Sequence, residues 1–305
     1  MAVTDSTTTT TILSGAKRAG RGPNRRSASI SVVIPTLNEA ANLPHVLPLI
    51  PDFVDEVVLV DGHSEDSTVE IARAIRPDIR VVLQDRRGKG NALACGFAAA
   101  EGDIIVMLDA DGSTDPNEIA QFVDALLDGS DFAKGSRYAY GGSSLDITRL
   151  RAAGNKGLAL AVNVLFRTRY TDLCYGYNAF WRHCLPYMSV TCDGFEVETL
   201  IHVRIARAGL TVTEVGSVEH PRLHGESKLN ALRDGIRVLR TIVRERARQH
   251  RAGRHHEGWR PSFRELAVGE GVPSITYSAD GVSRHDGHGA GALTELSPSV
   301  GAAGP

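Results

Sequence analysis

Short apolar runs alternate with segments of helical spacing from about residue 30 to residue 135. The runs are rich in β-branched residues and apolar at consecutive positions, which is typical of strands buried on both faces of a parallel sheet. Strands are predicted over 30–35, 56–61, 79–83, 103–108 and 132–135, and helices over 39–49, 67–75, 91–100 and 116–127. This alternation predicts an α/β fold with a mostly parallel sheet flanked by helices.

The two ends of the chain differ in composition from its middle. Residues 1–28 are rich in Thr, Ser, Gly and Arg, and residues 253–305 are rich in Gly, Ser, Ala and His. Such segments bury too little apolar surface to offset the entropy that ordering removes. We therefore expect a disordered arm over 1–28, one α/β domain over 29–226, a helix over 227–252 and a mostly disordered tail over 253–305.

Charge and cysteine content narrow the class of protein. The 34 Lys and Arg against 36 Asp and Glu give a net charge of −2, which does not favour nucleic acid as a partner. Cys95, Cys174, Cys184 and Cys192 form no CxxC pair, so we interpret them as thiols in a reducing compartment. Since no apolar run approaches the roughly 18 residues of a membrane span, and no secretory signal is evident, we expect a cytoplasmic protein.

Polar residues follow three of the predicted strands at their carboxyl ends, where parallel sheets bind ligands. They are Thr36, Asn38 and Glu39 after the first strand, Asp61, Gly62 and Ser64 after the second, and Asp109, Ala110 and Asp111 after the fourth. Each cluster alone is compatible with a helix cap or a turn. Three such clusters on one edge of a sheet indicate a binding site.

The Asp-Ala-Asp sequence after the fourth strand is a candidate metal site. Two carboxylates separated by one small residue can bind one divalent cation, and hard oxygen ligands favour Mg²⁺ or Mn²⁺, which keep open positions for phosphate oxygens. The basic, glycine-rich segment 86–91 (RRGKGN) is either an anion-binding turn or a solvated one. The spacings of a P-loop and of a GxGxxG dinucleotide motif after the first strand do not occur.

Eight motifs in a fixed order, within residues 29–245, carry the most specific signal. The first four are VVIPTLNEAANL (32–43), VLVDGHSEDST (58–68), RRGKGNAL (86–93) and MLDADGSTDP (107–116). Together they resemble family 2 glycosyltransferases of GT-A fold. The later motifs are GSRY (135–138), DLCYGYNAFWR (172–182), GFEVE (194–198) and HPRLHGESKLN (220–230). They are similar to the polyprenyl-phosphate, or dolichol-phosphate mannose synthase-like, branch, and most of all to its actinobacterial polyprenyl-phosphate N-acetylgalactosamine synthase type.

The resemblance implies an inverting enzyme that moves a sugar from a nucleoside diphosphate to a polyprenyl phosphate, for cell-envelope glycan synthesis. It places Mg²⁺ or Mn²⁺ on Asp109 and Asp111. It places the nucleotide sugar on Pro35, Asn38, Glu39, Asp61, Lys89, Asp109, Ala110 and Asp111. It places the acceptor phosphate on Arg137, Arg151 (with Arg149 as the alternative of that pair), Arg222 and Ser227. The expected catalytic residues are Asp111, Arg137, Arg222 and Glu198, the last as a group that contacts or supports the sugar.

One position departs from the family pattern. Dolichol-phosphate mannose synthases often carry Gln two residues after the second aspartate, where this chain has Ser113. We therefore expect water in place of a third protein ligand for the metal.

The nature of the acceptor decides which groups the chemistry requires. A phosphate is already ionised at pH 7, so it needs no general base, and arginine suits it because a guanidinium can bond two oxygens at once. A sugar hydroxyl needs a base, for which Asp193, Glu196 and Glu198 are candidates. A polysaccharide-building glycosyltransferase is thus the alternative, and an inactive nucleotide-sugar-binding scaffold is the candidate from another class.

A basic amphipathic pattern follows the last motif. Between Arg222 and Arg254 there are ten Lys and Arg and three acids, a local balance of +7. Such a helix can lie on an anionic leaflet, or its apolar stripe can pack on the domain. We expect a peripheral protein on the inner face of the cell membrane, with a small membrane protein as a candidate partner. The stripe is Leu229, Leu232, Ile236, Leu239 and Val243, at steps of three and four.

Overall fold

The computed structural model describes residues 28–226, 230–252, 277–278 and 281–282. The chain divides into two units, Met1–Glu257 and Gly258–Pro305. In the second unit the described residues form a two-residue antiparallel ladder between β10 (Tyr277–Ser278) and β11 (Gly281–Val282). The predicted arm over 1–28 and tail over 253–305 lie almost wholly outside the described residues, as does Ser227.

A seven-stranded sheet forms the centre of the first unit, in the order β3-β2-β1-β4-β7-β5-β8. Its neighbouring strands are parallel except where β7 pairs with β4 and β5. The mostly parallel sheet is confirmed, whereas the antiparallel β7 was not predicted. The strands are β1 (Ile30–Thr36), β2 (Glu56–Asp61), β3 (Arg80–Leu83), β4 (Ile104–Met107), β5 (Phe132–Ser136), β7 (Asn178–Trp181) and β8 (Val212–Gly216). A short parallel ladder joins β6 (Ser143–Ser144) to β9 (Val218–Glu219).

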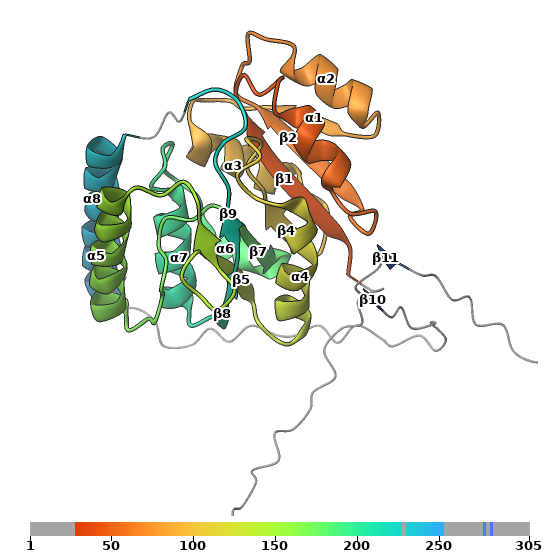
Figure 1. Ribbon diagram of the computed structural model, residues 1–305. Helices are drawn as coiled ribbons and strands as arrows, with labels where there is room; N and C mark the ends of the chain where they lie inside the picture. The colour runs from red at the N-terminus through yellow and green to blue at the C-terminus, as the bar shows by residue number, and fades with distance from the viewer. Residues whose placement is uncertain (1–27, 227–229, 253–276, 279–280, 283–305) are drawn as a thin grey trace, which may run out of the picture. The chain divides into compact units, whose positions relative to one another are not determined.

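Helices cover both faces of the sheet (Figure 1). Alternate residues of β1 enter different apolar clusters, with Val32 and Ile34 on one face and Val33 on the other. This period of two is what a strand buried on both faces requires. The helices are α1 (Leu43–Val46), α2 (Thr68–Ile75), α3 (Lys89–Ala99), α4 (Ile119–Leu127), α5 (Arg149–Phe166), α6 (Leu185–Met188), α7 (Val197–Ala208) and α8 (Ala231–Ala252), with 3-10 turns η1 (Leu47–Leu49), η2 (Pro116–Glu118) and η3 (Arg182–Cys184).

The helix predicted over 39–49 is only partly formed. α1 begins at Leu43 and passes into a 3-10 turn at Leu47, and the prolines Pro44 and Pro48 supply no amide hydrogens for a continuous helix. Glu39 therefore lies in the turn that precedes α1, at the carboxyl end of β1.

α8 packs through the face opposite to its apolar stripe. The anchor of that packed face is Glu245, whose carboxylate accepts hydrogen bonds from Arg204, Arg207 and Arg248. The alternative that the stripe packs on the domain is wrong, since Leu232, Ile236, Leu239 and Val243 are 43–77 % exposed. Leu229 lies outside the described residues. The buried residues are Asp234, Val238, Thr241, Ile242 and Glu245.

Candidate active site

The two aspartates after β4 are each paired with a cation. Both carboxylate oxygens of Asp109 lie near the Lys89 ammonium, with Nζ–O distances of 2.7 and 2.9 Å. Oδ2 of Asp111 lies 3.3 Å from Nη2 of Arg222. Ala110 between them is buried. The side chains of Asp109 and Asp111 are thus 28 % and 19 % exposed, and each carboxylate faces a side-chain cation.

Lys89 is the first residue of α3, and its ammonium lies between two carboxylates. Besides Asp109, it contacts Oε1 of Glu198 at 2.9 Å, in the first turn of α7. Burial lowers the pKa of Lys89, but attraction to Asp109 and Glu198 outweighs burial and raises that pKa above its ordinary value. A β-carbon on Gly176 would lie 2.9 Å from both Asp109 Oδ2 and Lys89 Nζ, so any larger residue there would displace the ends of these side chains.

The glycines beside Lys89 accommodate the chain itself. A β-carbon on Gly88 would lie 2.1 Å from the carbonyl oxygen of Asp193, and one on Gly90 would lie 2.3 Å from that of Cys192. The Gly90 amide also donates to the Asp193 carbonyl, at 3.0 Å. In this structure the glycines thus permit the close approach of segment 192–193, and the Lys89 side chain is the group of this segment that faces Asp109.

Arg222 connects the Asp-Ala-Asp loop to the start of α1. Its Nη1 contacts both oxygens of Glu39 at 3.0 and 3.1 Å. The amide of Leu223 donates to the Asp111 carbonyl at 3.1 Å, and the amide of His224 donates to Asn42 Oδ1 at 2.9 Å. The structure therefore brings Glu39, Asp111 and Arg222 together from three distant parts of the chain.

The other predicted nucleotide residues lie on the same edge of the sheet. β1 and β2 are parallel and in register, with Pro35 opposite Val60 and Thr36 opposite Asp61. Hydrogen bonds connect the loops that follow these two strands. The backbone N–H of Asn38 donates to Ser64 Oγ at 2.9 Å, and the backbone N–H of Ser64 donates to Asp61 Oδ2 at 3.1 Å. Asn38 adopts a left-handed conformation with φ of 59°, which asparagine tolerates.

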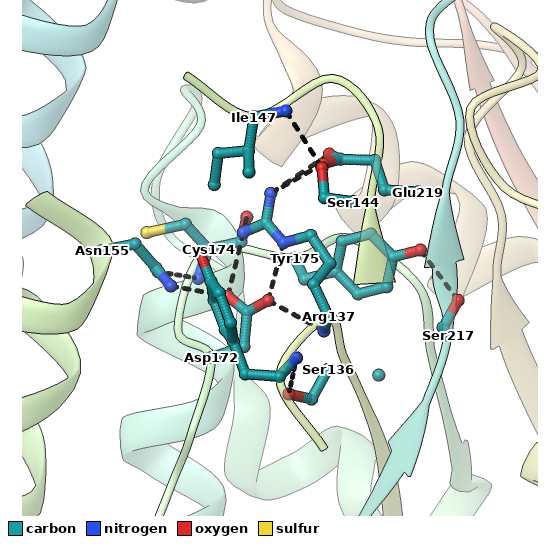
Figure 2. A network of polar contacts seen from close by, with 12 residues as sticks. Ser136, Arg137, Ser144, Ile147, Asn155, Asp172, Cys174, Tyr175, Ser217 and Glu219 are labelled. Carbon is teal, nitrogen blue, oxygen red and sulfur yellow. Dashed lines mark hydrogen bonds and ion pairs between the residues drawn. The ribbon is translucent and has the colours of Figure 1, made fainter. Parts of the chain in front are cut away.

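Arg137 lies in a buried network of ion pairs, which Figure 2 shows. Its Nε and Nη2 donate to the two oxygens of Asp172 at 2.7 and 2.9 Å, and Nη1 donates to Glu219 at 3.1 Å. Nη2 also donates to the carbonyl of Cys174, and the guanidinium lies 5.1 Å from the ring of Tyr175. Each guanidinium nitrogen already has a protein acceptor.

The remaining acceptor residues lie in different surroundings. Arg151, in the first turn of α5, pairs with Asp146 at 3.4 Å. Phosphate binding by Arg137 and Arg151 stays a prediction, and for Arg137 it requires the exchange of a carboxylate for the phosphate. Of the three predicted acceptor arginines, the contacts described here place Arg222 beside Asp111.

The donor set after β4 fits a hard divalent cation. Two carboxylates at one strand end supply the negative charge and the oxygen ligands that Mg²⁺ or Mn²⁺ prefers. Within the described part of the chain no group of three His, Cys, Asp or Glu could hold a metal. If Asp109 and Asp111 hold such an ion, it would offset the charge that develops on a leaving diphosphate.

The sheet topology and this edge define a glycosyltransferase of the GT-A class. The family described as Glycosyl transferase family 2 matches residues 31–196. The chain belongs to that family, so the predicted resemblance is confirmed at this level. The narrower actinobacterial branch stays a prediction.

Individual relatives share a large part of the chain. Glycosyltransferase AglJ of Haloferax volcanii is 33 % identical over 225 residues, which are 71 % of each protein. Dolichol-phosphate mannosyltransferase of Pyrococcus furiosus is 31 % identical over 210 residues, 66 % of this chain and 59 % of that enzyme. A solved structure of glucosyl-3-phosphoglycerate synthase from Mycobacterium tuberculosis, with Mn²⁺, UDP-glucose and phosphoglyceric acid, is 27 % identical with a TM-score of 0.59, covering 73 % of this chain and 81 % of that one.

Proposed function

We propose that the protein is an inverting glycosyltransferase that moves a sugar from a nucleoside diphosphate to a polyprenyl phosphate, in cell-envelope glycan synthesis. The observation that carries this proposal is the guanidinium of Arg222, 3.3 Å from Asp111. It supplies an anion-binding group directly beside the carboxylates assigned to Mg²⁺ or Mn²⁺. The mannosyltransferase relative supports a lipid-phosphate acceptor, and the neighbour with Mn²⁺ and UDP-glucose supports the donor class.

The pairing of the central carboxylates favours an acceptor that arrives ionised. Asp109 and Glu198 share Lys89, while Asp111 and Glu39 share Arg222. Each of these four carboxylates is engaged with a side-chain cation, so none stands as an unpaired base for a hydroxyl acceptor. A phosphate acceptor needs no proton removed, and the chain's role is to bring two like-charged phosphates together.

A hydroxyl acceptor is the second candidate, as in a polysaccharide-building enzyme. The M. tuberculosis synthase whose structure resembles this chain was solved with phosphoglyceric acid. Oε2 of Glu196 is buried and has no hydrogen-bond partner among the described residues, which leaves one carboxylate oxygen unengaged at the start of α7. If the acceptor is a hydroxyl, Glu196→Gln is expected to abolish transfer, because the base must be an ionised carboxylate.

The deciding experiment supplies both kinds of acceptor. Purified protein is incubated with polyprenyl phosphate or phosphoglyceric acid, with Mg²⁺ or Mn²⁺, and with labelled UDP-N-acetylgalactosamine, UDP-glucose or GDP-mannose. The proposal expects label in a lipid-soluble product from at least one donor. Label only in the phosphoglycerate product overturns the lipid acceptor. Metal-dependent nucleotide binding without transfer to any acceptor supports the inactive scaffold.

Arg222→Ala is expected to raise the KM for polyprenyl phosphate by roughly tenfold to a hundredfold, the equivalent of one charged hydrogen bond. The Kd of the nucleotide, measured by calorimetry, should change much less. Arg73→Ala removes an exposed arginine from α2 and serves as the matched control. An equal loss of acceptor and nucleotide affinity would undo the acceptor role of Arg222.

We further propose that the enzyme works as a peripheral protein on the inner face of the cell membrane. α5 and α8 pack side by side (Figure 1). Both helices carry exposed apolar side chains. Leu150, Leu160 and Val164 of α5 are 64–77 % exposed. α8 has seven arginines and two acids, which suits an anionic lipid surface. None of the described helices is long and apolar enough to cross a bilayer.

The double variant Ile236→Gln/Leu239→Gln is expected to weaken binding to phosphatidylglycerol-containing vesicles by at least about tenfold. Each apolar side chain transferred from water contributes about 1.5–3 kcal/mol when fully buried, and these side chains are only partly exposed. Sedimentation with vesicles measures the effect. Leu83→Gln, at an exposed position of β3, is the control. Equal sedimentation of the double variant and the wild type would remove the membrane proposal for α8.

A further inference from the structure

The ammonium of Lys89 lies against the carboxylate of Asp109, which the proposed function assigns to a divalent cation. It contacts both oxygens of Asp109, at 2.7 and 2.9 Å. A divalent ion bonded to those oxygens would lie so close to the ammonium that the two positive charges would repel strongly. The two cations therefore compete for Asp109.

We propose that Lys89 is a positioning residue that excludes the divalent cation from Asp109 until a nucleoside diphosphate draws the ammonium away. Metal and nucleotide then bind together, and the metal alone binds weakly. The inference rests on the proposed function, because it takes Asp109 as a metal ligand and a nucleoside diphosphate as the donor's leaving group.

Glu198 gives Lys89 an anchor that remains when Asp109 is released. Its Oε1 lies 2.9 Å from Nζ, and its side chain is only 7 % exposed on α7. The Lys89 side chain is 15 % exposed, so water screens these charges little. The unbranched stem of lysine lets the ammonium turn from Asp109 toward an anion while it keeps its contact with Glu198.

The arginine on the other aspartate is held differently. Arg222 has one contact with Asp111, at 3.3 Å, and two with Glu39, at 3.0 and 3.1 Å. It can release Asp111 and remain bound to Glu39. Competition with the cation is therefore strongest at Asp109, where both oxygens face the same ammonium.

The test measures Mn²⁺ binding to the full chain by calorimetry, with Mn²⁺ alone and with Mn²⁺ plus saturating UDP or GDP. Lys89→Met is expected to bind Mn²⁺ alone about tenfold or more tightly than the wild type does, because a positive charge beside Asp109 is gone. The improvement in Mn²⁺ affinity that the nucleotide produces should shrink in the variant, since this coupling is reciprocal between the two ligands. Lys89→Arg keeps the charge and should keep weak Mn²⁺ binding.

Controls separate this effect from a loss of folding. Lys156→Met makes the same change on the exposed side of α5 and should leave Mn²⁺ binding unchanged. Should Lys89→Met unfold, Lys89→Gln gives the same readout, because a neutral amide can still donate to the two carboxylates. The thermal midpoint of a Lys89 variant should also rise more on addition of Mn²⁺ than that of the wild type.

Two results overturn the proposal, and they are distinguishable. If the wild type binds Mn²⁺ in the presence of nucleotide but the neutral Lys89 variants bind Mn²⁺ alone no more tightly, the competition is wrong and the proposed function stands. If the wild type binds no Mn²⁺ with either nucleotide, the metal assignment fails and the competition fails with it.

Discussion

Asp111→Asn is expected to lower kcat/KM by roughly a thousandfold, the equivalent of about 4 kcal/mol of lost transition-state stabilisation. Asparagine preserves the shape of the side chain and can still accept the hydrogen bond from the Ser113 amide, 3.0 Å from Oδ1. It loses the charge that pairs with Arg222 and that we assign to the divalent cation. The measurement is transfer of labelled sugar at increasing Mn²⁺, and excess Mn²⁺ should restore little of the rate.

A matched control lies four residues further along the same loop. Asp115 caps the short turn η2 by accepting from the Asn117 amide at 2.9 Å. Asparagine is an equally good cap, so Asp115→Asn should retain most of the activity. If Asp111→Asn also turned over at a near-normal rate, Asp111 would not be a ligand of the cation.

The sequence pattern predicted the parallel part of the sheet but not β7. The strands of the parallel part are continuous apolar runs, so their pattern reports burial on both faces. β7, by contrast, is the short segment Asn178–Trp181 inside an aromatic motif, and its antiparallel pairing with β4 and β5 depends on contacts far along the chain. Periodicity within a segment carries no information about such partners.

The same limit applies to the candidate site. The motifs singled out Glu39, Asp111 and Arg222, but Glu39 and Arg222 are 183 positions apart, and only the fold shows that they touch. The motifs likewise did not indicate that Asp172 would bind Arg137, although Asp172 is the first residue of the motif DLCYGYNAFWR. Sequence motifs indicated which residues matter, whereas their pairing required the structure.

α8 shows why a hydrophobic stripe does not tell which face of a helix packs. The usual expectation buries the apolar stripe. In this chain Glu245 is buried instead, and three arginines pair with its charge. Burial raises the pKa of Glu245, but the bonds and charges of the arginines outweigh burial and leave that pKa below its ordinary value. The packed face of α8 thus combines the apolar Val238 and Ile242 with the paired charge of Glu245, and the longer apolar stripe is left exposed.

Arg137→Met is expected to lower the free energy of unfolding by about 3–5 kcal/mol, as removal of one partner from a buried ion pair does. Arg137 is 4 % exposed, and loss of its guanidinium leaves the carboxylates of Asp172 and Glu219 buried without their counter-charge. Chemical denaturation measures the difference. Arg151→Met is the control, since its pair with Asp146 is partly exposed and should contribute at most about 1 kcal/mol.

The pH dependence of the stability difference between the wild type and Arg137→Met tests whether the loss of an ion pair causes that difference. Burial raises the pKa of Asp172, but its bonds to Arg137 outweigh burial, so the pKa lies below the ordinary value in the folded protein. In the wild type this contribution to stability is therefore present above the unfolded pKa and is lost as the pH falls through the folded one. In Arg137→Met, burial dominates and Asp172 gains a proton at a higher pH, which relieves the uncompensated charge. The stability gap between the two proteins should accordingly narrow on acidification, whereas a purely steric effect of methionine would leave the gap constant with pH.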